Sequence, residues 1–235
     1  MVANIAWLVF IRAGSTRFPG KCFSSILGKN ALQWISDRSR LFGISPQDVI
    51  LCTSFDKTNQ RLIDQATVLG HQWIVGPEVY PIKRLTNNKS HLEPYKYIVR
   101  ICGDSPFYPF AFVRRLVETF ELLSPSAITN TRLRCFPSGY SIEIYDTSTL
   151  LTLLSTSSKL IYKEHMSEIL LSDFYDERNS IDILPVDPIS FFTSKRYTLD
   201  YPDDIHHLEQ EVLSGRVSMY DDLLDGLELA KGFYR

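Results

Sequence analysis

Short apolar runs alternate with helix-like patterns along the first half of this chain, and the alternation limits the folds it can adopt. The apolar runs predicted to be buried strands lie at residues 5–11, 49–53, 73–75 and 97–102. Between them, apolar side chains recur at helical spacing over residues 30–43 and 56–70. Strands that alternate with helices in this way predict an α/β fold with a parallel sheet.

The rest of the chain predicts further elements of the same kind. Helical patterns are predicted around residues 112–120 and 163–172 and from residue 203 onward, and strands at 127–129, 139–145 and 196–200. Residues 76–94 are rich in proline, asparagine and charge, which predicts a long loop. No repeat, low-complexity tract or linker divides the sequence, so we expect a single domain over residues 1–235.

A basic loop follows the first predicted strand. Residues 12–21, RAGSTRFPGK, carry the cations Arg12, Arg17 and Lys21 among small residues that let backbone N–H groups approach an anion. An ordinary solvated loop has the same composition, but ligands of open α/β sheets bind at the carboxyl ends of strands, where this loop lies. Neither the Walker spacing nor the dinucleotide-binding glycine pattern is present. The loop therefore predicts a binding site for a nucleoside triphosphate. The missing motifs argue against a kinase, a GTPase and an NAD-binding protein.

Asp104 and Asp200 each stand at the carboxyl end of a predicted strand. One aspartate after a strand is more commonly a helix cap or a turn residue. Two of them beside a basic loop fit a different chemistry, because Mg²⁺ in proteins is commonly held by one or two carboxylates together with substrate phosphates. The combination predicts metal-assisted nucleotidyl transfer.

The composition argues against several other classes of protein. The formal net charge is −2, and no polybasic run is present, so neither nucleic acid nor an anionic membrane surface is an expected partner. No apolar stretch approaches the roughly 20 residues of a membrane span, and no secretory leader is evident, so we expect a cytoplasmic protein. The four cysteines are scattered, which predicts neither a zinc site nor a disulfide framework.

Six short segments carry a resemblance to a known family. They are residues 12–21 (RAGSTRFPGK), 52–54 (CTS), 100–106 (RICGDSP), Gly139 with Glu143, 163–165 (KEH) and 199–204 (LDYPDD). In order and spacing they resemble the cytidylyltransferases of the spore coat polysaccharide biosynthesis protein F type. These are relatives of the 3-deoxy-manno-octulosonate and acylneuraminate cytidylyltransferases. The resemblance runs from the first strand to about Leu208.

The resemblance implies a fold and an activity. The fold is the nucleotide-diphospho-sugar transferase fold, a Rossmann-like, mostly parallel sheet flanked by helices. The activity is transfer of CMP from CTP to a sugar acid of the 2-keto-3-deoxy or sialic type, giving a CMP-sugar and pyrophosphate for surface polysaccharide. Mg²⁺ is the implied cofactor. A homodimer is also implied, with an arm for dimerisation and acceptor binding around residues 130–190.

The resemblance also implies roles for particular residues. The catalytic residues are Arg12, Lys21 and Asp104, and the metal ligands are Asp104 and Asp200. The nucleotide-binding residues are Arg12, Ala13, Gly14, Ser15, Arg17, Lys21, Thr53 and Asp104. The acceptor-binding residues are Glu143, Glu164 and His165.

Some alternatives stay open. Ser138 and Ser141 stand where the family usually carries carboxylates, so the acceptor differs or the chain is a silent nucleotide- or sugar-binding relative. A nucleotidyltransferase that uses another base or a sugar phosphate acceptor is a further possibility. Glu143 fits a salt-bridged strand residue as well as an acceptor ligand, and Arg100 fits a partner for a buried acid or a cation of the site.

Overall fold

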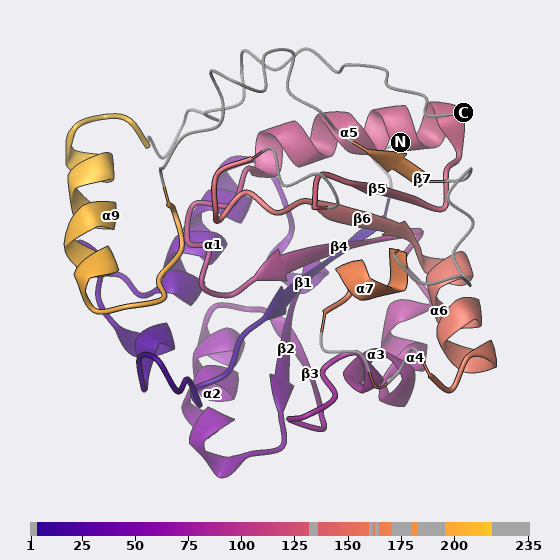
Figure 1. Ribbon diagram of the computed structural model, residues 1–235, viewed down its shortest axis with the longest axis horizontal. Helices are drawn as coiled ribbons and strands as arrows, with labels where there is room; N and C mark the ends of the chain where they lie inside the picture. Colours follow the sequence, from indigo (N-terminus) through magenta and orange to yellow (C-terminus); the bar gives the residue numbers. More distant parts are fainter. Residues whose placement is uncertain are drawn as a thin grey trace.

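The computed structural model describes residues 4–131, 136–159, 162, 165–170, 180–182 and 196–217. Seven strands form one sheet in the order β3-β2-β1-β4-β6-β5-β7 (Figure 1). Their bounds are β1 Ile5–Phe10, β2 Val49–Ser54, β3 Gln72–Gly76, β4 Tyr97–Cys102, β5 Ala127–Thr129, β6 Glu143–Asp146 and β7 Ser180–Asp182. Among these strands β6 alone runs antiparallel to its neighbours. The predicted, mostly parallel α/β sheet is confirmed.

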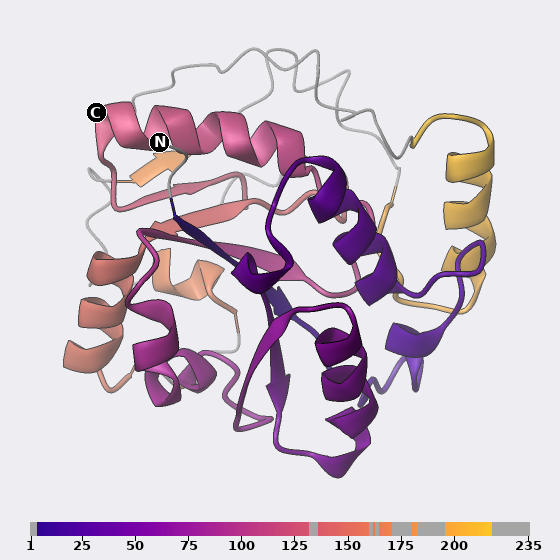
Figure 2. The same ribbon diagram turned by 180° about the vertical axis from the view of Figure 1, so that it is seen from behind.

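Helices cover both faces of the sheet (Figures 1 and 2). One face carries α1 (Ala31–Leu41), α2 (Gln60–Val68), α5 (Phe110–Leu123) and α9 (Asp203–Leu213), and the other α3 (Lys83–Asn87), α4 (Lys89–Leu92), α6 (Thr147–Thr156) and α7 (Ser167–Leu170). Alternate residues of each strand supply the two cores: Trp7 and Val9 point to the first face, Ala6 and Leu8 to the second. Apolar burial on both faces explains the continuous apolar runs of the central strands.

Polar side chains cap the start of α1 and of the short helix that leads into α2. The side chain of Asn30 accepts a hydrogen bond from the N–H of Gln33 and the Gln33 side chain accepts one from the N–H of Asn30, a capping box that starts α1. Asp56 accepts a 2.7 Å bond from the N–H of Thr58 and caps a short 3₁₀ helix, Lys57–Asn59, that leads into α2. The helical segment predicted from residue 56 therefore begins with a capped 3₁₀ turn, and α2 follows from Gln60.

Two expectations for local structure were wrong. The predicted loop at 76–94 contains α3 and α4, because Ile82, Leu85 and Leu92 are fully buried against the sheet and their packing outweighs the loop-like composition around them. Residues 197–200 join no strand ladder, and within the segment only Arg196 makes an isolated bridge, to Ser138. The segment is instead held by single backbone hydrogen bonds to neighbouring loops.

Part of the expected arm at 130–190 lies outside the described residues, including most of the predicted helix at 163–172, of which α7 is described. The single-domain organisation and the dimerisation arm stay predictions. Within the described ranges, no helix combines the length and the apolar character that a membrane crossing requires.

Candidate active site

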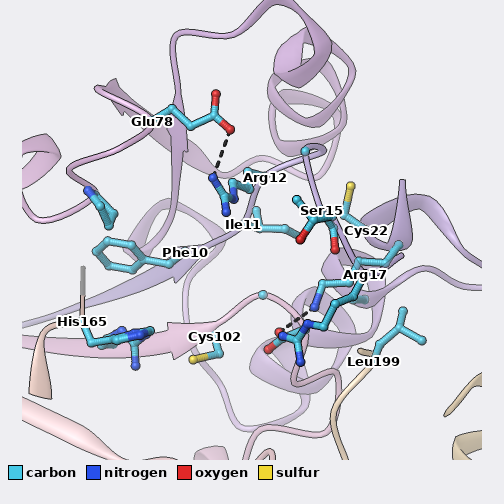
Figure 3. Close-up of a pocket in the computed structure, with 18 of the residues that line it drawn as sticks. Phe10, Ile11, Arg12, Ser15, Arg17, Cys22, Glu78, Cys102, His165 and Leu199 are labelled. Atoms are coloured by element: carbon cyan, nitrogen blue, oxygen red, sulfur yellow. Dashed lines mark hydrogen bonds and ion pairs between the residues drawn. The ribbon is translucent and has the colours of Figure 1, made fainter. Parts of the chain in front are cut away.

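A cavity of about 530 Å³ opens at the carboxyl ends of β1 and β4 (Figure 3). From β1 the chain continues outward to β2 and β3, whereas β4 lies on the opposite side of β1. The strand order therefore reverses at this point, which is where open α/β sheets bind their ligands. The basic loop after β1 lines the cavity, together with residues from β4 and the turn after it, from the segment after β3 and the start of α3, and from three further places in the chain. These residues are Arg100, Cys102, Gly103 and Asp104; Glu78, Val79, Pro81 and Arg84; and Ala31, His165, Met166 and Leu199.

Lys21 lies between the two aspartates that the sequence singled out. Its Nζ atom is 2.8 Å from Oδ2 of Asp104 and 3.2 Å from Oδ1 of Asp200. Nη2 of Arg17 also lies 2.9 Å from Oδ1 of Asp200. Burial disfavours the charged form of Lys21, but the two carboxylates outweigh it and raise the pKa of its ammonium group. Burial likewise opposes the charge of Asp200, but Lys21 overcomes it and the pKa of that carboxyl is lowered.

Asp104 and Asp200 also fit a divalent cation. They come from distant parts of the sequence, yet their oxygens lie close enough to share a single ammonium nitrogen. No group of three or more candidate metal ligands occurs in the part of the chain that the structure describes. A pair of carboxylates suits Mg²⁺, which usually keeps several waters and takes further oxygens from substrate phosphates.

The backbone around Asp104 is tightly packed. The N–H of Gly103 donates a 2.8 Å hydrogen bond to the carbonyl of Phe10, and a Cβ atom at position 103 would lie 2.4 Å from Cβ of Ile11. The carbonyl of Asp104 accepts a 2.8 Å bond from the N–H of Leu199, which ties the two acidic segments together. The close approach requires glycine and places Asp104 against the end of β1.

Asp204 positions Asp200 from the first turn of α9. Its Oδ2 atom accepts hydrogen bonds of 2.7 Å from the N–H of Asp200 and 2.8 Å from that of Tyr201. It also accepts a 2.7 Å bond from Arg196. Asp204 belongs to a segment that carried the family resemblance, but no role was predicted for it. The sequence does contain a signal for this role: Asp204 is an acidic residue at a predicted helix start, four residues after Asp200, where side chains commonly accept hydrogen bonds from backbone N–H groups.

The basic loop is anchored to the end of β2 by a residue that sequence reasoning missed. Oδ1 of Asn59 accepts a 2.7 Å bond from the N–H of Ala13, and its Nδ2 atom donates a 2.7 Å bond to Oγ of Ser54. Asn59 and Ser54 are both buried. The carbonyl of Ala13 accepts a 3.3 Å bond from Gly20. Both backbone polar groups of Ala13 therefore bond within the protein and shape the loop.

The remaining predicted nucleotide residues lie at different depths. Arg12, Gly14, Ser15 and Arg17 line the cavity. Thr53 is fully buried and is not among the lining residues, so its assignment to nucleotide binding stays a prediction.

Glu78 faces the basic loop from the segment after β3. Nη1 of Arg12 lies 3.0 Å from Oε1 of Glu78, and Figure 3 shows the two side chains directed toward each other. Arg84 of α3 is buried and donates to the carbonyl oxygens of Pro77, at 3.0 Å, and Glu78, at 3.4 Å. Arg84 thus fixes the backbone that carries Glu78.

The predicted acceptor residues are not all at the cavity. His165 is exposed and lines it, whereas Glu164 lies outside the described residues. Glu143 is buried and pairs with Nη1 of Arg100 at 2.6 Å, which confirms the interpretation of Arg100 as the partner of a buried acid. Arg100 lines the cavity and Glu143 does not, so Glu143 acts on the cavity through Arg100. Its acceptor-binding role stays a prediction.

Comparison with protein families gives one match that spans most of the chain. A family model described as cytidylyltransferase matches residues 6–214. No curated protein sequence matches the chain significantly.

Solved structures of similar fold include several nucleotidyltransferases. A cytidylyltransferase from Leptospira borgpetersenii superposes with a TM-score of 0.80 at 22% identity, covering 95% of this chain and 92% of that one. A CMP:2-keto-3-deoxy-manno-octonic acid synthetase complexed with CTP gives a TM-score of 0.59 at 15% identity, covering 91% and 99%. The 4-diphosphocytidyl-2C-methyl-D-erythritol synthase from Anaerococcus prevotii gives 0.60 at 13% identity, covering 88% and 95%. At these identities the likeness shows a shared fold, in agreement with the predicted fold class.

Proposed function

The chain belongs to the cytidylyltransferase family, and from that premise we propose that it transfers CMP from CTP to a sugar acid, with release of pyrophosphate. The observation that carries the proposal is the position of Lys21, which contacts Asp104 and Asp200 directly beside the basic loop. Four charged residues line the cavity at the strand-order reversal, where a triphosphate would enter: Arg12, Arg17, Lys21 and Asp104. Asp200 is not a lining residue and reaches the cavity through its contacts with Lys21 and Arg17.

The basic loop binds and orients the triphosphate in this proposal. Arg12, Arg17 and Lys21 line the cavity, and their positive charges stabilise the β- and γ-phosphates that leave as pyrophosphate. An acceptor hydroxyl attacks the α-phosphorus, the bond to the bridging oxygen of pyrophosphate breaks, and the hydroxyl proton passes to solvent or a nearby base. Positioning and charge stabilisation supply most of the catalysis in such phosphoryl-type transfers.

We assign the cofactor role to Mg²⁺ held by Asp104 and Asp200. When bound, the metal neutralises phosphate charge and aligns the reacting groups. Asp104 and Asp200 would hold the cation, and Lys21, which contacts both of them, would then be free to bind the phosphates. Asp204 keeps Asp200 in place through its backbone N–H.

The sugar acid is the acceptor that the family resemblance favours. One structural neighbour is named as a CMP:2-keto-3-deoxy-manno-octonic acid synthetase, which supports an acceptor of that chemical class. The cavity extends beyond the basic loop to Arg100 and His165, which gives an acceptor room beside the nucleotide. Surface polysaccharide synthesis is the pathway class that such a product serves.

Thermal unfolding with each of CTP, UTP, ATP and GTP, with and without Mg²⁺, tests the nucleotide half of the proposal. A ligand at about a hundred times its dissociation constant stabilises the folded state by roughly 2.7 kcal/mol. We expect CTP with Mg²⁺ to give the largest shift. A larger shift with another nucleotide would assign a different base, and no shift with any would leave a silent relative as the better description.

An Asp104→Asn variant tests the catalytic half. It should remain folded and lose pyrophosphate release when CTP is offered with a panel of keto sugar acids and sugar phosphates. Asp64→Asn is the matched control, because Asp64 is an exposed residue of α2 away from the cavity. Equal turnover in both variants would rule out a role for Asp104. Turnover with a sugar phosphate alone would correct the acceptor.

We also propose a homodimer, on the family resemblance alone. Sedimentation analysis of the full chain measures its mass in solution directly. A monomer at micromolar concentration would contradict the proposed dimer and would leave the proposed reaction unaffected.

A further inference from the structure

Arg100 is a charged residue in the middle of an otherwise apolar strand. Its neighbours along β4, Val99 and Ile101, are fully buried in the core on one face of the sheet, and its own side chain is 14% exposed. It points to the opposite face and lines the cavity together with Cys102 and His165. A guanidinium at such a depth is costly unless its hydrogen bonds are made.

Glu143 accepts a hydrogen bond from the Arg100 guanidinium, and both of its carboxylate oxygens have hydrogen-bond donors. The two residues are directly opposed on β4 and β6, and the Nη1 to Oε1 distance is 2.6 Å. Oε2 of Glu143 accepts a 2.6 Å bond from the hydroxyl of Tyr145. Burial opposes the charge of Arg100, but the neighbouring Cys102 and Glu143 raise its pKa, so the guanidinium is permanently charged. Glu143 and Tyr145 therefore hold Arg100 in one orientation.

The rest of the guanidinium has no acceptor in the protein as far as the structure describes it. Arginine has five N–H donors, and the bond from Nη1 to Glu143 is the hydrogen bond that Arg100 makes among the described residues. The Nε and Nη2 atoms form the fork that binds a carboxylate through two parallel bonds. An anion in the cavity would complete the hydrogen bonding of Arg100.

We propose that Arg100 binds the anionic group of the acceptor, with Glu143 as its positioning residue. The group is the carboxylate of a sugar acid or, if the acceptor is a sugar phosphate, its phosphate. This inference rests on the proposed function, because it takes the cavity to hold an acceptor beside the nucleotide. It reverses the expected order of contact: Arg100 touches the acceptor, and Glu143 touches Arg100.

Small anions test the site without knowledge of the full acceptor. The melting temperature is measured with pyruvate, with its neutral ester ethyl pyruvate and with inorganic phosphate, at constant ionic strength. Each is added to the protein alone and to protein saturated with CTP and Mg²⁺, where the basic loop is already occupied. Pyruvate is expected to raise the melting temperature and ethyl pyruvate to leave it unchanged. A shift with phosphate in place of pyruvate would identify a sugar phosphate acceptor.

A double variant separates loss of anion binding from loss of folding stability. Arg100→Gln alone leaves Glu143 as a buried, unpaired charge, so the double variant Arg100→Gln/Glu143→Gln removes both charges. It should keep the shift caused by CTP, while its apparent dissociation constant for pyruvate rises about tenfold or more, the usual effect of losing hydrogen bonds to a charged group. Arg115→Gln, at an exposed position on α5, is the control for charge alone.

The outcomes separate the two proposals. An anion shift that is equal in the wild type and the double variant, or absent from the wild type, overturns the role of Arg100. A wild type that fails to respond to CTP overturns the proposed function, whereas the anion shift measured without nucleotide still decides for or against Arg100.

Discussion

Replacement of Gly103 by alanine tests how tightly the site depends on the junction between β1 and β4. A Cβ atom at this position would lie 2.4 Å from Cβ and 2.7 Å from Cγ1 of Ile11, and 2.9 Å from the carbonyl oxygen of Phe10. Two of these atoms belong to a buried side chain and the third to the backbone of the central strand. None of them is the far end of a flexible side chain, so the backbone at 103 has to move.

The size of the effect follows from these distances. Ordinary contacts of a Cβ atom begin near 3.4 Å, so the 2.4 Å contact requires a shift of about 1 Å. Overpacking of this kind typically costs about 1–3 kcal/mol. In a protein of this length 1 kcal/mol lowers the melting temperature by roughly 2–4 °C. We therefore expect Gly103→Ala to lower the melting temperature by roughly 2–12 °C and to displace Asp104, the next residue, from Lys21.

The assay is thermal unfolding with and without CTP and Mg²⁺. Gly28→Ala is the matched control: Gly28 has a φ of +83° and no atom within 4 Å of an added Cβ, so alanine there costs only the left-handed conformation, about 1–2 kcal/mol. Both variants should lose stability, but only Gly103→Ala should also lose the stabilisation by CTP. If Gly103→Ala keeps the full shift caused by CTP, the reasoning about this junction is wrong.

Three further predictions concern the loop anchor, a buried histidine and the metal. Asn59→Ala leaves the N–H of Ala13 without its acceptor, so KM for CTP should rise by roughly 3–10-fold with little change in kcat, as steady-state kinetics would show. Burial lowers the pKa of His71 below its unfolded value near 6.5, so stability is complete above about pH 6.5 and falls as the pH decreases. Denaturant unfolding at several pH values should show that the free energy of unfolding depends less on pH in His71→Gln than in the wild type. In the exposed control His206→Gln the dependence on pH should be unchanged. Chelation of Mg²⁺ should abolish turnover yet leave the nucleotide-free melting temperature unchanged, because Lys21 and Arg17 already pair with the site's aspartates.

The sequence predicted the sheet because burial on both faces leaves continuous apolar runs, and β1, β2 and β4 fall where those runs are. It failed at α3 and α4 because these helices are too short to show a helical period and their few buried residues, such as Leu85, are separated by polar ones. Their structure is decided by packing on the sheet, which a local pattern does not contain.

The sequence predicts those charged residues of the candidate site that come after a predicted strand. Arg12 comes directly after one apolar run and Asp104 one residue after another, so their convergence at one edge follows from a parallel sheet, and Lys21 belongs to the loop that Arg12 begins. Asn59 and Asp204 could not be found in this way, because each acts on a backbone N–H whose position depends on the folded loop. The pairing of Arg100 with Glu143 needed the antiparallel register of β4 and β6, which no local signal fixes.

The charges of the site also bear on how nucleotide and metal depend on each other. Every cation of the basic loop has an acidic partner in this structure: Arg12 contacts Glu78, Arg17 contacts Asp200, and Lys21 contacts Asp104 and Asp200. A triphosphate that recruits Lys21 takes away the ammonium group that Asp104 and Asp200 share, close to each other and to the phosphates, and leaves Asp200 with Arg17 and, at 3.7 Å, Arg196. Like charges at such distances are strongly unfavourable unless another cation replaces the ammonium group. CTP without Mg²⁺ must therefore compete with the protein's own aspartates for Lys21, so the thermal shift caused by CTP should depend steeply on Mg²⁺.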